Sequence, residues 1–219
     1  MGSVEQMAGY RDYLLAETPP ASLGKPVTEI CLFKLLPTYA RDHTAAEAEF
    51  CSQIVANTTP GKPYAKGIRA LTWGFSEADP ATFFWTLDWD KIENHWDFWL
   101  TPSFSPVIAA INKLFEPGRP LVRHFDFDGA KTPSRTLSVA RFMIWDDGTE
   151  GVTEGRARAL GNSKGMAREV LEGYAVDVNE QTWWCSLLLY ESLEEAADDH
   201  VKSGDGAESH IVRLRRQDA

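Results

Sequence analysis

The chain has 219 residues, of which 25% are charged and 43% are hydrophobic, and its formal net charge is -10. This composition is typical of a folded domain with a sizeable core. It disfavours a nucleic-acid partner, because phosphate binding requires clustered Lys and Arg. No apolar run approaches the roughly 18 residues that a membrane span needs, so we expect a cytoplasmic protein without a membrane partner.

The three cysteines, Cys31, Cys51 and Cys185, lie far apart inside apolar runs. Their spacing fits neither a CxxC metal site nor a disulfide framework. We therefore expect buried free thiols in a reducing compartment and no metal site.

The first half of the chain alternates strand and helix signals after an N-terminal arm at residues 1–25. Apolar and β-branched runs predict strands at 27–36, 67–75, 82–89 and 121–127. Helical spacing of Ala46, Phe50 and Ile54 predicts a helix at 44–57, and a second helical region at 92–115 is expected to break near Pro102 and Pro106. The order β-α-β-β-α-β is that of a ferredoxin-like unit, which we place at 26–129.

The second half, residues 130–219, repeats this order in a degenerate form. We predict strands at 137–145, 174–178, 183–191 and 211–214, with helices at 152–171 and 193–201. The segments beginning at Phe83 and Trp184 align without gaps, which pairs Trp89 with Tyr190 at the same strand-to-helix junction. Such a match at equivalent positions indicates an internal repeat.

Several predicted strands are apolar on both faces, as in Ile30 and Leu32 against Cys31 and Phe33. Strands of this kind are covered on both sides. We therefore predict an α+β fold in which two tandem ferredoxin-like repeats face each other and form an intramolecular dimeric-type α/β barrel. The ligand cavity is expected in the space between the two sheets.

Three segments carry a family resemblance: VTEICLFKLLP, LDWDKIENHWDFWLTPSFSP and VRHFDF, with YESLEEAADDHVKS echoing the second. Together they resemble the dimeric α/β barrel superfamily, in its antibiotic-biosynthesis-monooxygenase-like (ABM domain) and stress-responsive A/B barrel branches, over residues 27–215. The resemblance implies a cofactor-independent enzyme of polyketide or aromatic secondary metabolite biosynthesis, either a monooxygenase with molecular oxygen as co-substrate or a cyclase or isomerase. Haem, which some relatives bind through one axial His, stays open, as does pairing of chains into a homodimer.

Two histidines are the candidate catalytic groups. His95 lies in the helix after the third strand, and His124 shares a strand face with Asp126, two residues on. A His can take a proton and a carboxylate can orient it. A surface His95 and a core His124 explain the same pattern without catalysis.

The candidate ligand-binding residues are aromatic or basic. Aromatic walls suit flat ring systems, and a strand Arg is costly unless it is paired inside the protein or meets an anionic ligand oxygen. Structural pairing is the favoured interpretation of each Arg, core packing accounts for part of the Trp residues, and Tyr64 is also explained as an ordinary exposed loop residue. The candidates are Trp73, Trp85, Trp89, Trp99, Tyr64, Arg69 and Arg141.

The chain contains no GxGxxG, P-loop, HExxH or GxSxG motif, so nucleotide, zinc and serine-hydrolase chemistry lack support. Two alternatives to an enzyme remain. One is a non-catalytic barrel, stress-responsive or otherwise, that binds a hydrophobic ligand, and the other is a structural protein whose barrel is filled by its own side chains.

Overall fold

The computed structural model describes residues 4–118, 120–127, 133, 136–146, 165–201 and 207–218. Its strands form one antiparallel sheet in the order β8-β5-β7-β6-β4-β1-β3-β2-β9. The strands are β1 (Val27–Lys34), β2 (Ile68–Phe75), β3 (Thr82–Trp89), β4 (Leu121–Phe127), β5 (Val139–Asp146), β6 (Glu169–Ala175), β7 (Trp183–Tyr190), β8 (Glu208–Arg213) and β9 (Arg215–Asp218). The helices are α1 (Val4–Glu17), α2 (Pro37–Ala40), α3 (His43–Phe50), α4 (Ala56–Thr58), α5 (Ile92–Phe98), α6 (Phe104–Leu114) and α8 (Leu193–Asp198).

The first half follows the predicted β-α-β-β-α-β order, and its strand predictions are confirmed to within a few residues. The helix predicted at 44–57 runs from α3 through a π-helical turn, Cys51–Val55, into α4. Asp42 begins it, because its carboxylate accepts a hydrogen bond from the Ala45 amide. The helical region predicted at 92–115 is broken before Phe104 into α5 and α6, as the nearby prolines indicated.

The second half departs from the prediction at its second strand. Glu169 to Leu171, predicted as the end of a helix, belong to β6, and most of the strand predicted at 174–178 is a loop. This segment becomes a strand because it pairs with β7 on one side and β4 on the other, so tertiary pairing overrides its helix-like composition. The rest of the predicted helix at 152–171 lies mostly outside the described residues. The predictions for β5, β7 and α8 are confirmed to within a few residues, and β8 includes residues 211–213 of the strand predicted at 211–214.

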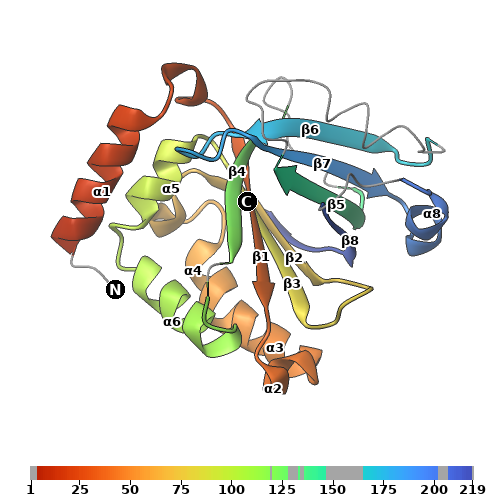
Figure 1. The fold of residues 1–219 in the computed structure, drawn as a ribbon. Coiled ribbons are helices and arrows are strands. Elements are labelled where there is room, and N and C mark those ends of the chain that lie inside the picture. Colours follow the sequence, from red (N-terminus) through yellow and green to blue (C-terminus); the bar gives the residue numbers. More distant parts are fainter. Residues whose placement is uncertain are drawn as a thin grey trace.

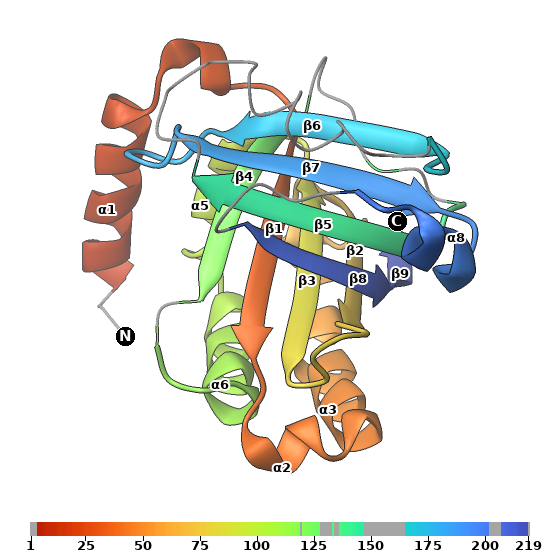
Figure 2. The same cartoon turned by 45° about the vertical axis from the view of Figure 1, so that its right-hand side comes forward.

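The sheet closes on itself almost completely. Strands 4-1-3-2 and 8-5-7-6 follow each other in the same pattern, and β4 joins the halves by pairing with β6. On the other side, β9 pairs with β2 and Ser76 bridges Val212. Figures 1 and 2 show the strands of the second half running across those of the first.

Two glycines lie where the halves meet. A Cβ atom at Gly173 would stand 2.0 Å from the backbone oxygen of Asp126, and one at Gly74 would stand 2.3 Å from that of Arg213. Both distances are far below any van der Waals contact, so the close approach of the strands at each junction requires glycine.

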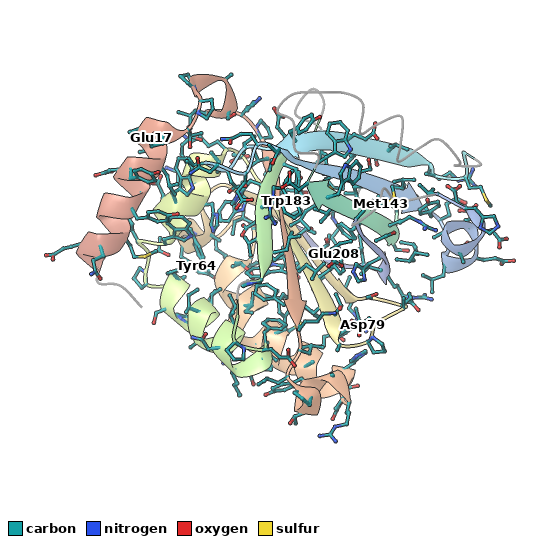
Figure 3. All side chains as sticks on the ribbon, in the orientation of Figure 1. Glu17, Tyr64, Asp79, Met143, Trp183 and Glu208 are labelled. Carbon is teal, nitrogen blue, oxygen red and sulfur yellow. The ribbon has the colours of Figure 1, made fainter. Side chains whose placement is uncertain are left out.

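The interior of the barrel is a packed core. Ile30, Phe84 and Phe125 from the first half meet Phe142 and Leu187 from the second, and all are buried. The rings of Phe84 and Phe142 stack 4.6 Å apart. Side chains fill the space between the two halves of the sheet (Figure 3). The expectation of a ligand cavity at this place is therefore wrong, because large inner-face residues of both halves occupy it.

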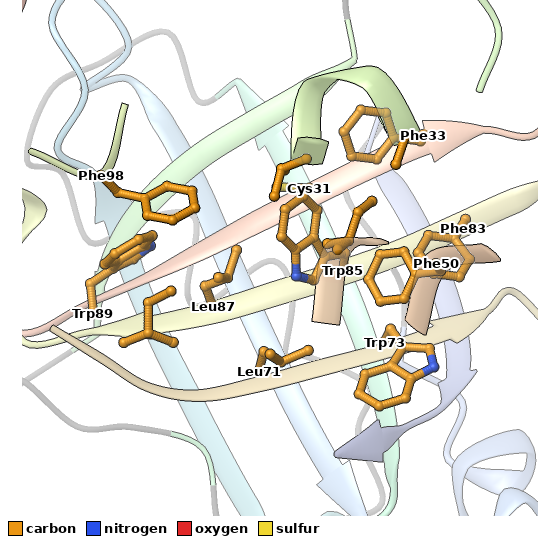
Figure 4. Packing of buried hydrophobic residues seen from close by; sticks show 14 of the residues in the cluster. Cys31, Phe33, Phe50, Leu71, Trp73, Phe83, Trp85, Leu87, Trp89 and Phe98 are labelled. Atoms are coloured by element: carbon orange, nitrogen blue, oxygen red, sulfur yellow. The ribbon is translucent and has the colours of Figure 1, made fainter. Parts of the chain in front are cut away.

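The outer face of the first half is covered by helices α1 and α3 to α6 (Figure 1). Cys31, Phe33, Trp85, Leu87 and Trp89 point to this side, and Figure 4 shows several of them against Phe50 and Phe98. A smaller apolar cluster with α8 covers the outer face of the second half. In the part of the chain that the structure describes, no helix has both the length and the apolar character to cross a membrane.

Candidate functional site

A cavity of about 410 Å³ lies between the outer face of the first-half sheet and helices α1, α5 and α6. This volume is within the usual range for small-molecule sites. Its walls are mostly aliphatic and aromatic, and the few polar groups that reach it include Glu29 and His95. The polar groups lie at one end of the β1 and β3 strands, so the cavity has a chemically distinct end.

Behind that end runs a chain of hydrogen-bonded side chains. His95 Nδ1 lies 2.7 Å from His124 Nε2, and His124 Nδ1 lies 2.7 Å from Asp177 Oδ1. The Trp99 indole N–H donates to the remaining nitrogen of His95, Nε2, over 2.9 Å. The side chain of His95 is 12% exposed, that of His124 4% and that of Asp177 24%, so the chain leads from the cavity wall through a buried histidine to a half-buried carboxylate.

Each member of this chain is positioned by its own element. His95 and Trp99 are four residues apart on the helical region that begins with α5, which places them on one face. His124 is central in β4. Asp177 lies in the loop after β6, which is tied down because the Val176 amide donates to the His124 carbonyl and the His124 amide donates to Asp177 Oδ2. The second half of the chain therefore supplies the carboxylate of a site in the first half.

Glu29 is a second buried carboxylate at this site. It lies on β1 directly opposite His124 on β4, and its Oε2 atom is 3.7 Å from a nitrogen of each histidine. The Trp89 indole N–H donates to Oε2 over 2.8 Å, and the Cys31 thiol lies 3.5 Å from Oε1. A buried carboxylate with these partners is stabilised in its charged form.

The hydrogen bonds fix where the protons sit. An indole nitrogen only donates, so His95 Nε2 must accept from Trp99 and His95 Nδ1 must carry the proton. Nδ1 then donates to His124 Nε2, and His124 Nδ1 donates to Asp177. Every donor has an acceptor in this arrangement, which is the form of the pair before it takes up an added proton.

The two histidines have opposite affinities for an added proton. Burial, against the attraction of Glu29 and together with the positive charge of a protonated His124, lowers the pKa of His95 to about 4. Burial also opposes charge on His124, but the carboxylates of Asp177 and Glu29 outweigh it and raise the pKa of His124 above its usual value. For Glu29, burial is outweighed by His95, His124 and Trp89, which lower its pKa to about 2. Because the pair shares one hydrogen bond, a proton received at His95 would leave the positive charge on His124.

Glu29, His95 and His124 are also close enough to hold a metal ion. Their ligand atoms are separated by 2.7, 3.7 and 3.7 Å, so a point about 2.0 Å from all three exists, which matches metal–nitrogen bonds. A neutral imidazole bound to metal through Nδ1 carries its proton on Nε2, however, and would then face the Trp99 donor. The observed hydrogen bonds therefore fit a shared proton better than a metal.

The structure brings together several of the sequence candidates. Trp85, Trp89, Trp99 and His95 line the cavity, and His124 lies directly behind His95. Asp126 does not orient His124, because it pairs with Lys25 and the carboxylate at His124 belongs to Asp177.

The remaining candidates lie away from the cavity. The Arg69 guanidinium lies near Asp90 and the Trp89 carbonyl, the Trp73 indole donates to Glu47, and the Tyr64 hydroxyl donates to the Ala56 carbonyl. Each of these contacts is with another residue of the protein.

Arg141 shows how the second half differs from the first. It occupies the position in β5 that Glu29 occupies in β1, two residues after the pairs Val139–Tyr190 and Val27–Trp89. Its guanidinium donates to the backbone oxygens of Ala196 and Asp199 instead of facing a histidine. The acidic position of the first half is thus a structural arginine in the second.

Sequence reasoning missed Glu29 and Asp177. A lone acid in the apolar strand VTEICLFK signals a buried, paired charge, so Glu29 could have been found. Asp177 lies in VDVNEQ, where Asp and Asn are ordinary turn residues. Nothing in its local sequence marks it.

This chain resembles known proteins in its fold and not in its sequence. No family profile matches the sequence, and no curated protein matches it. Solved structures do match. A candidate monooxygenase from Fusobacterium nucleatum has a TM-score of 0.57 at 13% identity, covering 89% of this chain and 95% of that one. A candidate monooxygenase from Lactobacillus acidophilus has a TM-score of 0.57 at 11% identity over 89% and 96% of the two chains. An anthrone oxidase-like protein has a TM-score of 0.58 at 12% identity over 89% and 94%.

This chain shares their fold. At such low identity the likeness extends to the fold alone, and it confirms the predicted class: α+β, with ferredoxin-like topology and a nearly closed antiparallel barrel. The fusion of two copies and the unit boundaries at 26–129 and 130–219 stay predictions, and so do the catalytic and binding roles of the candidate residues.

Proposed function

We propose that this protein is a cofactor-independent enzyme that takes a proton from a small aromatic or polyketide-like compound and directs the resulting carbanion to molecular oxygen. One observation carries the proposal: a hydrogen-bonded His95–His124–Asp177 chain ends at a cavity whose walls are mostly carbon. A buried base beside an apolar cavity suits removal of a proton from a weakly acidic carbon.

In the proposed reaction, a flat ring lies against Trp89 and Phe98, and the Trp99 indole moves off His95 Nε2. That nitrogen takes the proton, and the Nδ1 proton shifts to His124. The positive charge then lies between Asp177 and Glu29 rather than beside the apolar wall. Because both carboxylates are already in place, the protein stabilises this charge without reorganising.

The oxygen step needs no further reactant. The carbanion of a CH₂ group next to a ring adds O₂ to give a hydroperoxide anion, which the His pair protonates. Loss of water, with the second C–H proton, leaves a carbonyl. One CH₂ and one O₂ thus become one C=O and one H₂O, which is the conversion of an anthrone to an anthraquinone. The name of one structural neighbour, anthrone oxidase-like protein, makes anthrone the first compound to test.

Two other functions use the same cavity. A cyclase or isomerase would need the proton transfer without oxygen. A non-catalytic ligand-binding protein is favoured by one observation, that the Trp99 indole donates to His95 Nε2, the nitrogen that would act as the base.

The deciding experiment follows anthrone in the wild-type protein and in His95→Gln. We expect the wild type to consume one O₂ per anthrone and His95→Gln to lose at least a hundredfold in kcat/KM, the usual range for a general base. Without oxygen, the wild type should exchange the CH₂ deuterium of labelled anthrone. Exchange without oxygen uptake would support the isomerase alternative. Binding without either reaction would refute the enzyme proposal in favour of a carrier.

A further inference from the structure

The Trp99 indole, which covers the base nitrogen of His95, is itself covered by a ring of α1. The ring of Tyr10 lies nearly parallel to the indole, at 10°, with the ring centroids 5.9 Å apart. The indole meets the His95 imidazole at 74° and donates its N–H to Nε2 over 2.9 Å. Tyr10 thus contacts a face of the indole, whereas His95 contacts the edge that carries the N–H.

The backbone holds Trp99 only loosely. Trp99 comes directly after Phe98, the last residue of α5, and helix ends fray. Its amide donates to the His95 carbonyl over 3.3 Å, which is longer than the usual N–H···O bond. Its side chain is only partly buried. The side chains that touch the indole therefore have a large share in fixing where its N–H points.

Tyr10 belongs to a helix that is attached to the protein along a narrow face. Between residues 5 and 17, Leu14 is the one residue that is buried. Arg11 pairs with an exposed carboxylate of α5, and such exposed pairs contribute little. Tyr10 lines the cavity, and α1 lies beside α5 (Figure 1). A displacement of α1 would therefore separate Tyr10 from Trp99 and open the same wall of the cavity.

We propose that Tyr10 is a positioning residue, whose stack on Trp99 holds the indole N–H on His95 Nε2 and so governs when that nitrogen is free to take a proton. An aromatic pair is strong enough to shift such an equilibrium several-fold. Because α1 also forms a wall of the cavity, the position of one helix sets both the access of a ligand and the availability of the base. The inference rests on the proposed function only in taking His95 Nε2 as the base.

NMR of the indole N–H tests this contact without a substrate. The Trp99 signal is the one that Trp99→Phe removes. In Tyr10→Ala this N–H should exchange with water about three- to tenfold faster, which corresponds to the loss of one aromatic pair. The nitrogen signal of His95 Nε2 should move toward its position in Trp99→Phe, because the hydrogen bond to the indole is weakened.

Two variants are matched controls. Tyr10→Phe keeps the stacked ring and removes only the hydroxyl. Tyr13→Ala removes a second tyrosine of α1, which is 47% exposed and stacks on Tyr10. In both variants the exchange of the Trp99 N–H should stay within twofold of the wild type.

Exchange in Tyr10→Ala within twofold of the wild type, or an equal acceleration in Tyr13→Ala, would overturn the proposal. In the Trp99→Phe background, Tyr10→Ala should leave the His95 Nε2 signal unchanged, and a change there would overturn the proposal as well, because Tyr10 would then act by another route. If Tyr10→Ala does not fold, the wild type decides: a nuclear Overhauser effect between the Tyr10 and Trp99 rings is expected, and its absence would refute the stack.

None of these measurements needs turnover, so the two proposals can fail separately. If anthrone is not oxidised while Tyr10→Ala frees the Trp99 indole, the proposed function alone is refuted. If anthrone is oxidised while the indole of Tyr10→Ala stays in place, the role of Tyr10 alone is refuted.

Discussion

Replacing Asp177 with Asn tests the direction in which the histidine chain carries protons. Asp177 uses both oxygens, one for the His124 amide and one for the His124 ring. The Asn oxygen must stay with the backbone amide, because two donors cannot face each other. The Asn NH₂ then faces His124 Nδ1 and forces the ring proton to Nε2, which in turn places the His95 proton on Nε2. His95 Nε2 then carries a proton and can no longer act as the base.

The magnitude follows from the charge that Asp177 stabilises. A carboxylate about 4 Å from the centre of a protonated His124 contributes about 4 kcal/mol at an effective dielectric constant near 20. That corresponds to about a thousandfold in rate when the charge forms in the transition state. A comparable tautomer error in a serine-protease triad costs about ten thousandfold. We therefore expect Asp177→Asn to lose 10³ to 10⁴ in kcat/KM, as an order of magnitude.

The assay is anthrone-dependent oxygen uptake, together with nitrogen NMR of the histidine tautomers, which requires no substrate. Asp126→Asn is the control, because Asp126 is two residues from His124 but pairs with Lys25. This variant should lose less than tenfold in kcat/KM. The reasoning fails if Asp177→Asn keeps the His124 Nδ1–H tautomer, or if the two variants lose activity equally.

Four further predictions follow from other parts of the structure. Trp99→Phe removes the indole donor that occupies His95 Nε2, so the histidine pair binds a proton more readily and the apparent pKa of the pair rises. The acid limb of the pH profile of kcat/KM should therefore move up by about one pH unit. An acid limb that does not move would exclude Nε2 as the base. Gly173→Ala places a Cβ 2.0 Å from a backbone oxygen, and urea unfolding should show a loss of about 3 kcal/mol; a neutral result would mean that the strands separate easily at this junction. Phe84→Ala opens a void in the barrel core and should lower the free energy of unfolding by about 3–5 kcal/mol, while the affinity for anthrone, measured without oxygen, stays within twofold; a large loss of affinity would place the ligand inside the barrel. Since Arg141 replaces Glu29 in the second half, calorimetry without oxygen should give one anthrone bound per chain, and two would show a second site.

The sequence predicts the fold well where local patterns and tertiary pairing agree. β1, β3 and α3 carry strong apolar spacing and clear stop signals, and their predicted positions hold. Glu169 to Leu171 were misassigned because β6 owes its structure to two neighbouring strands, which no local pattern contains. The sequence wrongly predicts a ligand cavity between the two halves of the sheet. Apolar residues on both faces of a strand indicate that both faces are buried, but the pattern does not distinguish burial by side chains from burial by a ligand.

The candidate site was predicted only in part for the same reason. His95 and His124 could be chosen because histidine carries its chemistry wherever it lies. Their contact depends on α5 meeting β4 across the sheet, and no residue spacing expresses it. Asp126 was the nearest acid in sequence to His124, whereas Asp177 is the nearest in space because the β6 loop docks on β4.

The pairing of β9 with β2 also bears on how the protein reaches its native state. Ala70 pairs with Asp218, so this contact joins distant parts of the sequence, and such contacts form slowly because a long loop must close. Until then the edge of β2 is bare, and bare edges recruit strands from other molecules. The danger of aggregation is therefore concentrated in the interval before closure, and conditions that delay docking of the last strand should reduce the yield of refolding without weakening the finished protein.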